Sequence, residues 1–88
     1  MNSCFYCDNI AIYQVGFSRY NWMQKAIVKG YSCLACIPTA LERLGNGSFG
    51  TEYWPVIIRD KKIIYHSYIA YMDGFSHLSG WENYLSTL

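Results

Sequence analysis

CFYC at residues 4–7 and CLAC at residues 33–36 are two C-x2-C motifs that hold all four cysteines of this 88-residue chain. A C-x2-C turn brings two sulfur atoms close enough to bind one ion, and a second such turn completes the four soft ligands that zinc prefers. The two motifs therefore predict one tetrahedral zinc site. Its ligands would be Cys4, Cys7, Cys33 and Cys36.

The segment directly after the second motif has the pattern of a short helix. Residues 37–45 carry Pro38 near the start, Leu41 and Leu44 three residues apart, and a glycine at the end. A metal-binding turn, a β-rich stretch and a second such turn running into a helix resemble the treble-clef and zinc-ribbon-like zinc fingers. The resemblance covers Cys4 to about Leu44, half of the chain. It implies that the first cysteine pair lies in a zinc knuckle and the second at the start of the helix.

Other interpretations of the cysteines stay open at this point. A rubredoxin-type iron site also uses two C-x2-C motifs, but a glycine directly follows each of its motifs, whereas Asp8 and Ile37 stand there in this chain. A thioredoxin-type dithiol at residues 33–36 would need a surrounding βαβ pattern, which is missing. Disulfides or metal-free thiols complete the set. Four thiolates would close the coordination shell of a zinc ion, so we expect a structural rather than a catalytic metal.

The sequence carries no motif of a known type of enzyme active site. There is no phosphate-binding loop, no dinucleotide-binding glycine pattern, no nucleophile elbow and no H-x-E zinc-hydrolysis motif. His66 and His77 are isolated histidines among tyrosines and serines, and we expect them at the surface or in hydrogen bonds rather than as ligands or bases. We therefore expect a protein that is not an enzyme.

Composition favours a small folded domain with a β-rich, aromatic core. Hydrophobic residues make up 52% of the chain and charged residues only 15%, which excludes disorder. A chain this short buries a limited share of its surface, so a metal staple is expected. The formal net charge of +1 supplies no strong field for phosphates or anionic lipid. The absence of a signal peptide or an apolar span predicts a cytoplasmic protein with no membrane contact.

The predicted fold class is α+β, a small zinc-stapled domain with two β-hairpins, the short helix and a C-terminal helix. The first hairpin would use residues 10–15 and 22–28 with a turn at 16–21, and the second would use residues 52–58 and 62–72 with a turn at 59–62. Three glycines in residues 45–50 predict a hinge or mobile loop. We expect a zinc-binding lobe at residues 1–45 and an aromatic hairpin with the C-terminal helix at residues 46–88, packed as one compact unit.

The C-terminal segment predicts a capped amphipathic helix. Ser79 and Glu82 have the spacing of a capping box, in which each side chain bonds the backbone of the other. Trp81, Leu85 and Leu88 follow at i, i+4 and i+7, so they would lie on one face and pack against the sheet.

Aromatic residues make up 18% of the chain, more than a core of this size easily buries. The second half therefore contains the candidate partner-binding residues, in which aromatic rings are accompanied by two cations at the predicted hairpin tip. These are Tyr53, Trp54, Arg59, Lys61, Tyr65, Tyr68 and Tyr71. Plain packing of the same rings in the core remains the alternative.

The sequence predicts a non-catalytic module that binds another protein, because Tyr and Trp with few charges are typical of protein interfaces. An adaptor, or a phage- or mobile-element-encoded inhibitor of a host protein machine, fits a compact chain of this kind. The alternative is a nucleic-acid-binding zinc finger protein with a regulatory role, which would need cations interleaved with the rings. A homodimer that covers the excess aromatic surface is also open.

Overall fold

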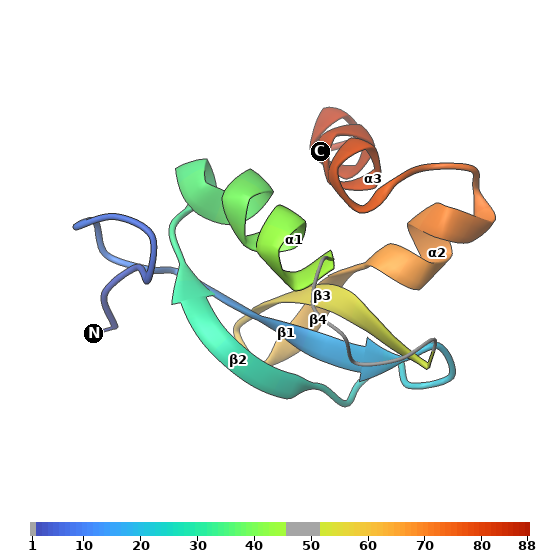
Figure 1. Ribbon diagram of the computed structural model, residues 1–88, viewed down its shortest axis with the longest axis horizontal. Helices are drawn as coiled ribbons and strands as arrows, with labels where there is room; N and C mark the ends of the chain where they lie inside the picture. The colour runs from blue at the N-terminus through green and yellow to red at the C-terminus, as the bar shows by residue number, and fades with distance from the viewer. Residues whose placement is uncertain (1, 46–51) are drawn as a thin grey trace.

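The structure is a computed structural model that describes residues 2–45 and 52–88. A four-stranded antiparallel sheet has the order β2-β1-β3-β4 and lies under three helices, as Figure 1 shows. The strands are β1 (Tyr13–Arg19), β2 (Ile27–Ser32), β3 (Tyr53–Arg59) and β4 (Lys62–His66). The helices are η1 (Leu34–Cys36), α1 (Ile37–Gly45), α2 (Ser67–Met72) and α3 (His77–Ser86). The predicted α+β class is confirmed, including the two hairpins and the helix after the second C-x2-C motif.

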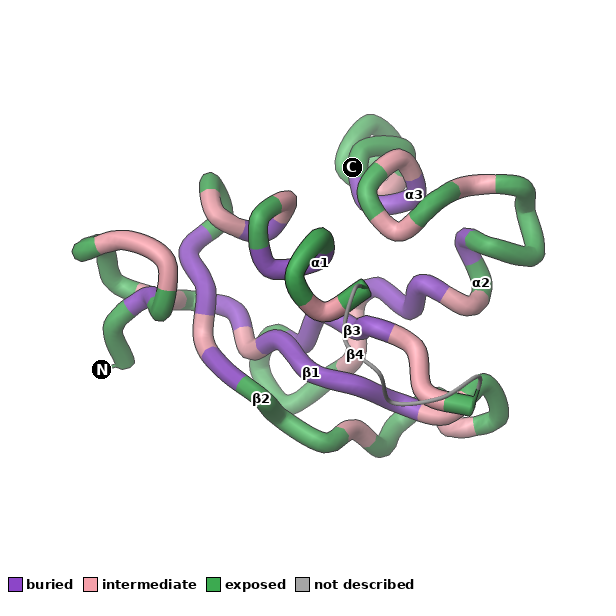
Figure 2. Tube along the Cα trace, in the orientation of Figure 1, coloured by how far each residue is buried: buried purple, intermediate pink, exposed green. Residues whose placement is uncertain are grey.

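The two hairpins join through β1 and β3, so one sheet contains strands from both halves of the chain. Val15 lies opposite Ile57 in this central pair, and both side chains are fully buried. The core lies between the sheet and the helices, where Figure 2 shows the buried stretches of β1 and β3 facing α1 and α3. Its members are Tyr13, Val15, Ile37, Ala40, Leu41, Ile57, Tyr65, Ala70 and Trp81. Within the described ranges, no helix is both long and apolar enough to cross a bilayer.

Trp81 of α3 is the largest buried side chain and holds the C-terminal helix on the sheet. Its ring lies edge-on to Tyr13 of β1 and Tyr65 of β4, with centroid distances of 6.2 and 5.5 Å. It also stacks on Tyr84 at 5.4 Å. The aromatic face predicted for this helix is therefore correct at Trp81 and wrong at Leu88, which lies beyond the helix and is 83% exposed.

The first hairpin differs from its prediction, because Gly16 lies inside a strand rather than in the turn. β1 extends from Tyr13 to Arg19 and pairs with β2, and the connection occupies residues 20–26. A Cβ at position 16 would overlap the carbonyl oxygen of Ile27, so the glycine permits the close approach of β2. The Ser18 hydroxyl donates to the carbonyl of Lys25 at 2.5 Å, which folds the connection back onto the sheet.

The predicted long strand at residues 62–72 is wrong beyond His66, where α2 begins. The ring of His66 caps this helix, because its Nδ1 accepts the backbone N–H of Tyr68 at 3.2 Å. Burial of Ala70 against the aromatic core then favours a helix over the β propensity of this tyrosine-rich stretch. The predicted hinge at residues 45–50 lies, apart from Gly45, outside the described residues.

The predicted capping box of the last helix is present, but it lies three residues earlier. Ser76 is the N-cap, and its hydroxyl accepts the backbone N–H of Ser79 at 3.1 Å. The Ser79 hydroxyl accepts the backbone N–H of Ser76 at 2.8 Å in return. Serine at the third position replaces the usual acidic partner, so the Ser79–Glu82 spacing pointed to the wrong pair.

We predict that Gly80→Ala destabilises the fold although alanine favours a helix. A Cβ at position 80 would overlap Ala70 and lie 2.5 Å from the Tyr65 hydroxyl, so α3 would have to move away from α2 and β4. The overlap outweighs a propensity gain of about 1 kcal/mol, and we expect a net loss of about 1–2 kcal/mol in urea unfolding. The exposed control Glu82→Ala should stay within about 0.5 kcal/mol. Unchanged or higher stability of Gly80→Ala would contradict this packing.

Candidate metal centre

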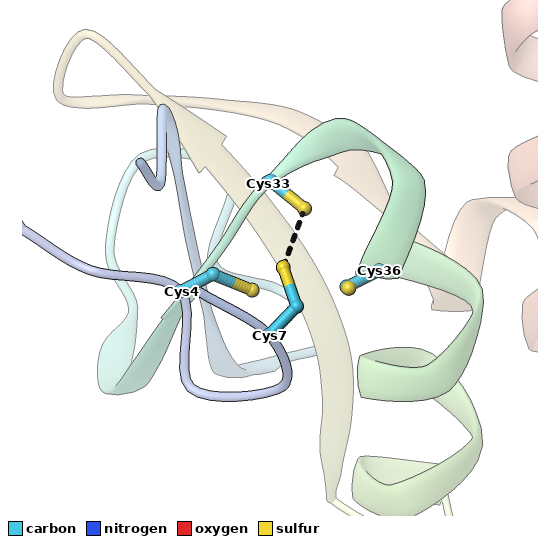
Figure 3. Close-up of side chains that lie close together, drawn as sticks. All are labelled: Cys4, Cys7, Cys33 and Cys36. Atoms are coloured by element: carbon cyan, nitrogen blue, oxygen red, sulfur yellow. Dashed lines mark hydrogen bonds between the residues drawn. The ribbon is translucent and has the colours of Figure 1, made fainter. Parts of the chain in front are cut away.

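The four predicted ligands come together at one end of the molecule. One Sγ atom from each of Cys4, Cys7, Cys33 and Cys36 lies within 4.8 Å of all the others. Figure 3 shows the four sulfur atoms pointing toward a common centre, two from the loop before β1 and two from the segment that joins β2 to α1. The chain order of knuckle, hairpin and helix implied by the treble-clef resemblance is thus present around this cluster.

The first pair lies in a turn that positions its sulfurs through backbone hydrogen bonds. The N–H of Tyr6 donates to Cys4 Sγ at 3.4 Å, and the N–H of Asn9 donates to Cys7 Sγ at 3.5 Å. The Phe5 N–H bonds the carbonyl of Tyr31 at 3.0 Å, which attaches the turn to the outer edge of β2. N–H donors aimed at sulfur favour the thiolate form, which is the form that binds metal.

The second pair is positioned by the start of the helical segment. Cys33 directly precedes η1, and Cys36 is its last residue, so one short turn separates the two sulfurs. The Cys36 N–H donates to the Cys33 carbonyl at 3.2 Å and closes this turn. Ile37 follows as a fully buried residue, which anchors α1 in the core. The packing of α1 therefore determines where the second pair lies.

The thiols perturb one another strongly, as four ionisable groups at this distance must. Burial raises the pKa of Cys4, but hydrogen bonds from the backbone of Cys33 and Tyr6 and from neighbouring thiols outweigh it and lower that pKa to about 6. The neighbouring thiols of Cys33 and Cys7 raise the pKa of Cys36 to about 12. One thiolate therefore forms readily, and full ionisation of the cluster requires a cation at its centre.

The cluster fits one metal ion. Four thiolates at about 2.3 Å from a tetrahedral ion lie about 3.8 Å from one another, close to the observed spread. Cys7 and Cys33 lie 3.5 Å apart, whereas a disulfide bond joins sulfurs at about 2.05 Å. All four cysteines are free thiols. The site can therefore bind one metal ion through four soft ligands.

The seven candidate partner-binding residues do not form one surface. Tyr65 lies in the core, where its hydroxyl donates to the carbonyl of His77 at 2.8 Å. Arg59 and Lys61 lie at the β3–β4 turn, at the opposite end of β3 from Tyr53. The Arg59 guanidinium stacks on the Tyr13 ring at 5.6 Å. The two cations are therefore separated from the aromatic residues with which the prediction grouped them.

The remaining rings gather at the other end of the sheet, in what we call the aromatic surface. Trp54 lies at its centre, 5.2 Å from Tyr68 and 5.1 Å from Tyr71. Tyr20, which sequence reasoning missed, lies 5.6 Å from Tyr68. Tyr71 is 60% exposed and Tyr20 49%, so the surface is open to solvent. Its members are Tyr20, Trp54, Tyr68 and Tyr71.

Trp22 is a second residue that sequence reasoning missed. Its ring lies edge-on to Tyr53 at 6.1 Å and is flanked by the guanidinium of Arg19 at 5.6 Å and the ammonium of Lys25 at 5.2 Å. Arg19 also forms an ion pair with Glu52 at 2.9 Å. The spacing of Arg19, Trp22 and Lys25, three residues apart, was the available signal, but it was attributed to a strand.

Neither histidine lies in the metal centre. Both ring nitrogens of His66 are engaged, because Nε2 bonds the Arg19 carbonyl at 3.0 Å and Nδ1 accepts from Tyr68. Burial lowers the pKa of His66, although its bonds to backbone groups of Arg19 and Trp22 oppose the shift. The ring of His77 lies 6.1 Å from Trp54, and burial lowers its pKa as well. The expectation that His66 is hydrogen-bonded agrees with these contacts.

We predict that His66 makes stability depend on pH in the mildly acidic range. A buried histidine with a lowered pKa stays neutral in the folded chain while the unfolded chain takes up a proton, so its contribution is complete above pH 6.5 and declines as the pH falls below it. The free energy of unfolding of His66→Gln should therefore fall less than that of the parent between pH 7 and 5. Acid loss of metal affects both chains, so the difference in slope is the readout. Equal slopes would contradict a neutral buried His66.

Comparisons with protein-family models, with curated proteins and with solved structures return no match for this chain.

Proposed function

We propose that this chain is a small zinc-binding domain in which the metal is structural and which acts by binding a partner protein without catalysis. The convergence of four cysteine sulfurs carries the proposal. Thiolates are soft ligands that suit zinc, and four of them occupy every position of a tetrahedral shell. No position is then left for a water or substrate. The metal would hold the first knuckle, β2 and α1 together.

The choice of zinc over iron rests on the surroundings of the thiols. Asp8 and Ile37 follow the two motifs where rubredoxin-type knuckles have glycine. The Arg43 guanidinium lies over the Tyr6 ring at 5.2 Å, which places a positive charge beside the cluster. A divalent ion with four thiolates carries a net charge of −2, and this cation partly balances it.

The aromatic surface supports a protein partner. Large rings that are half-buried in the free protein add contact area at a low cost in side-chain entropy, and they often dominate binding energy. Within the described residues, no ion pair involves Tyr20, Trp54, Tyr68 or Tyr71, and His77 is the ionisable ring beside them. An adaptor or an inhibitor would present such a surface to a larger protein.

Nucleic-acid binding is a second candidate, because Trp22 lies between Arg19 and Lys25. A ring flanked by cations suits base stacking next to a phosphate. The ion pair of Arg19 with Glu52 reduces the local positive charge, and the chain as a whole carries only +1. We therefore rank this candidate second.

The metal proposal predicts one zinc ion per chain in elemental analysis of the purified protein. Cobalt substitution should yield the absorption of a tetrahedral four-thiolate site. Cys33→Ser should lower the free energy of unfolding by at least about 3 kcal/mol, because structural zinc contributes roughly 10–16 kcal/mol of apparent binding energy in finger peptides. Ala35→Ser, in the same turn but not at a ligand position, is the matched control and should keep the zinc. A metal-free chain with four reactive thiols, or a bound iron, would contradict the proposal.

The partner proposal predicts that the zinc-loaded chain retains a stoichiometric protein from a lysate at moderate salt. Tyr71→Ser should weaken that complex about tenfold, because an exposed interface ring typically contributes more than about 1 kcal/mol. Ile12→Ser, which also removes a half-exposed apolar side chain but lies near the metal centre, should leave binding unchanged. Tight, salt-steep binding to oligonucleotides that Lys25→Gln weakens would instead establish the nucleic-acid candidate.

A further inference from the structure

A cavity of about 250 Å³ opens between α2, α3 and β4, away from the metal centre and distinct from the aromatic surface. Three aromatic rings line it, those of Tyr65, Phe75 and Tyr84, and the carboxylate of Asp73 lies in its wall. The volume is below the roughly 300–1,000 Å³ of sites for drug-sized ligands and corresponds to about eight water molecules at ~30 Å³ each. It suits a single side chain.

The charges around the cavity all have the same sign. From residue 63 to residue 88 the sequence contains no lysine and no arginine, and its two charged residues are Asp73 and Glu82. Asp73 is exposed and has no ion-pair partner among the described residues. Neither α2 nor α3 has a basic residue in its last turn, so the partial negative charge at these helix ends is not balanced locally. The cavity therefore has a negative potential.

The polar groups inside the cavity add no positive charge. His66 lines it, but Nδ1 of its ring accepts a hydrogen bond from Tyr68, which keeps the imidazole neutral. The ring centroids of Tyr65 and Tyr84 lie 6.3 Å apart, so one cation placed between them is within the roughly 6 Å range of cation–π attraction for both. The rings and the Asp73 carboxylate thus favour the same kind of ligand.

We propose that this cavity, which we call the cation pocket, receives a lysine or arginine side chain presented by the partner protein. The inference rests on the proposed function and adds the chemistry of the partner: a basic side chain whose aliphatic stem contacts the rings and whose charged end reaches Asp73. An acidic or purely apolar segment would not satisfy the carboxylate. Tyr84 and Asp73 are the two residues on which recognition depends most directly.

The test uses the full zinc-loaded chain and two short peptides, acetyl-Gly-Gly-Lys-Gly-Gly-amide and its counterpart with norleucine in place of lysine. Titration followed by NMR should shift the backbone amides of residues 69–75 and 80–87 with the lysine peptide. The norleucine peptide should bind about 3- to 30-fold more weakly, which is the range that cation–π attraction supplies. Asp73→Asn should weaken lysine-peptide binding about threefold or more.

Two matched controls make the result specific. Glu82→Gln removes the other carboxylate of α3 without touching the pocket and should leave binding of the lysine peptide within twofold of the parent. Tyr84→Leu should weaken that binding, whereas Tyr71→Leu, which removes an exposed ring outside the pocket, should not. If Tyr84→Leu fails to fold, the Asp73→Asn and Glu82→Gln pair still decides the question.

Equal binding of the two peptides, shifts confined to other residues, or no shift at millimolar peptide would overturn the proposal and leave the cavity a packing space only. Equal effects of Asp73→Asn and Glu82→Gln would overturn it as well. The zinc analysis and the partner capture are independent of these measurements. A chain that holds one zinc and retains a protein partner, but shows no preference for lysine, loses the cation pocket and keeps the proposed function.

Discussion

Mutual repulsion among four thiolates within 4.8 Å is the constraint on which the N-terminal half of this protein depends. A low pKa at Cys4 beside a high pKa at Cys36 shows that the metal-free cluster ionises only in part. A central cation removes the repulsion and converts it into attraction among four separate points of the chain. The knuckle, the end of β2 and the start of α1 are thereby joined, although they share little apolar surface.

The sheet transmits that order to the rest of the molecule. β1 leaves the first knuckle, pairs with β2 on one side and with β3 on the other, and so places the second hairpin beside the metal-stabilised one. The helices then cover one face, with Trp81 packed between Tyr13 and Tyr65. This arrangement leaves the aromatic surface at the far end of β3 and the cation pocket between α2 and α3. Both proposed recognition sites therefore lie on the part of the fold that carries no metal.

The prediction succeeded where the signal is local and failed where neighbours decide. The C-x2-C spacing and the Pro38 to Gly45 pattern depend on residues a few positions apart, and both correspond to what the structure contains. Gly16 looks like a turn residue, but it is required by the close approach of Ile27 across the hairpin. The tyrosine-rich stretch after His66 has β propensity, yet a histidine cap and burial of Ala70 make it helical.

The sequence by itself determined the four thiol ligands, the α+β class and the helix that follows the second motif, because ligand chemistry and short-range periodicity are written in adjacent residues. Only the tertiary structure decided which aromatic residues are buried, which face solvent and which line a cavity. Tyr65, Trp54 and Tyr84 have similar local sequence surroundings, and they differ in what the sheet and helices place against them. Burial depends on contacts between distant segments, and such contacts exist only once the chain has folded.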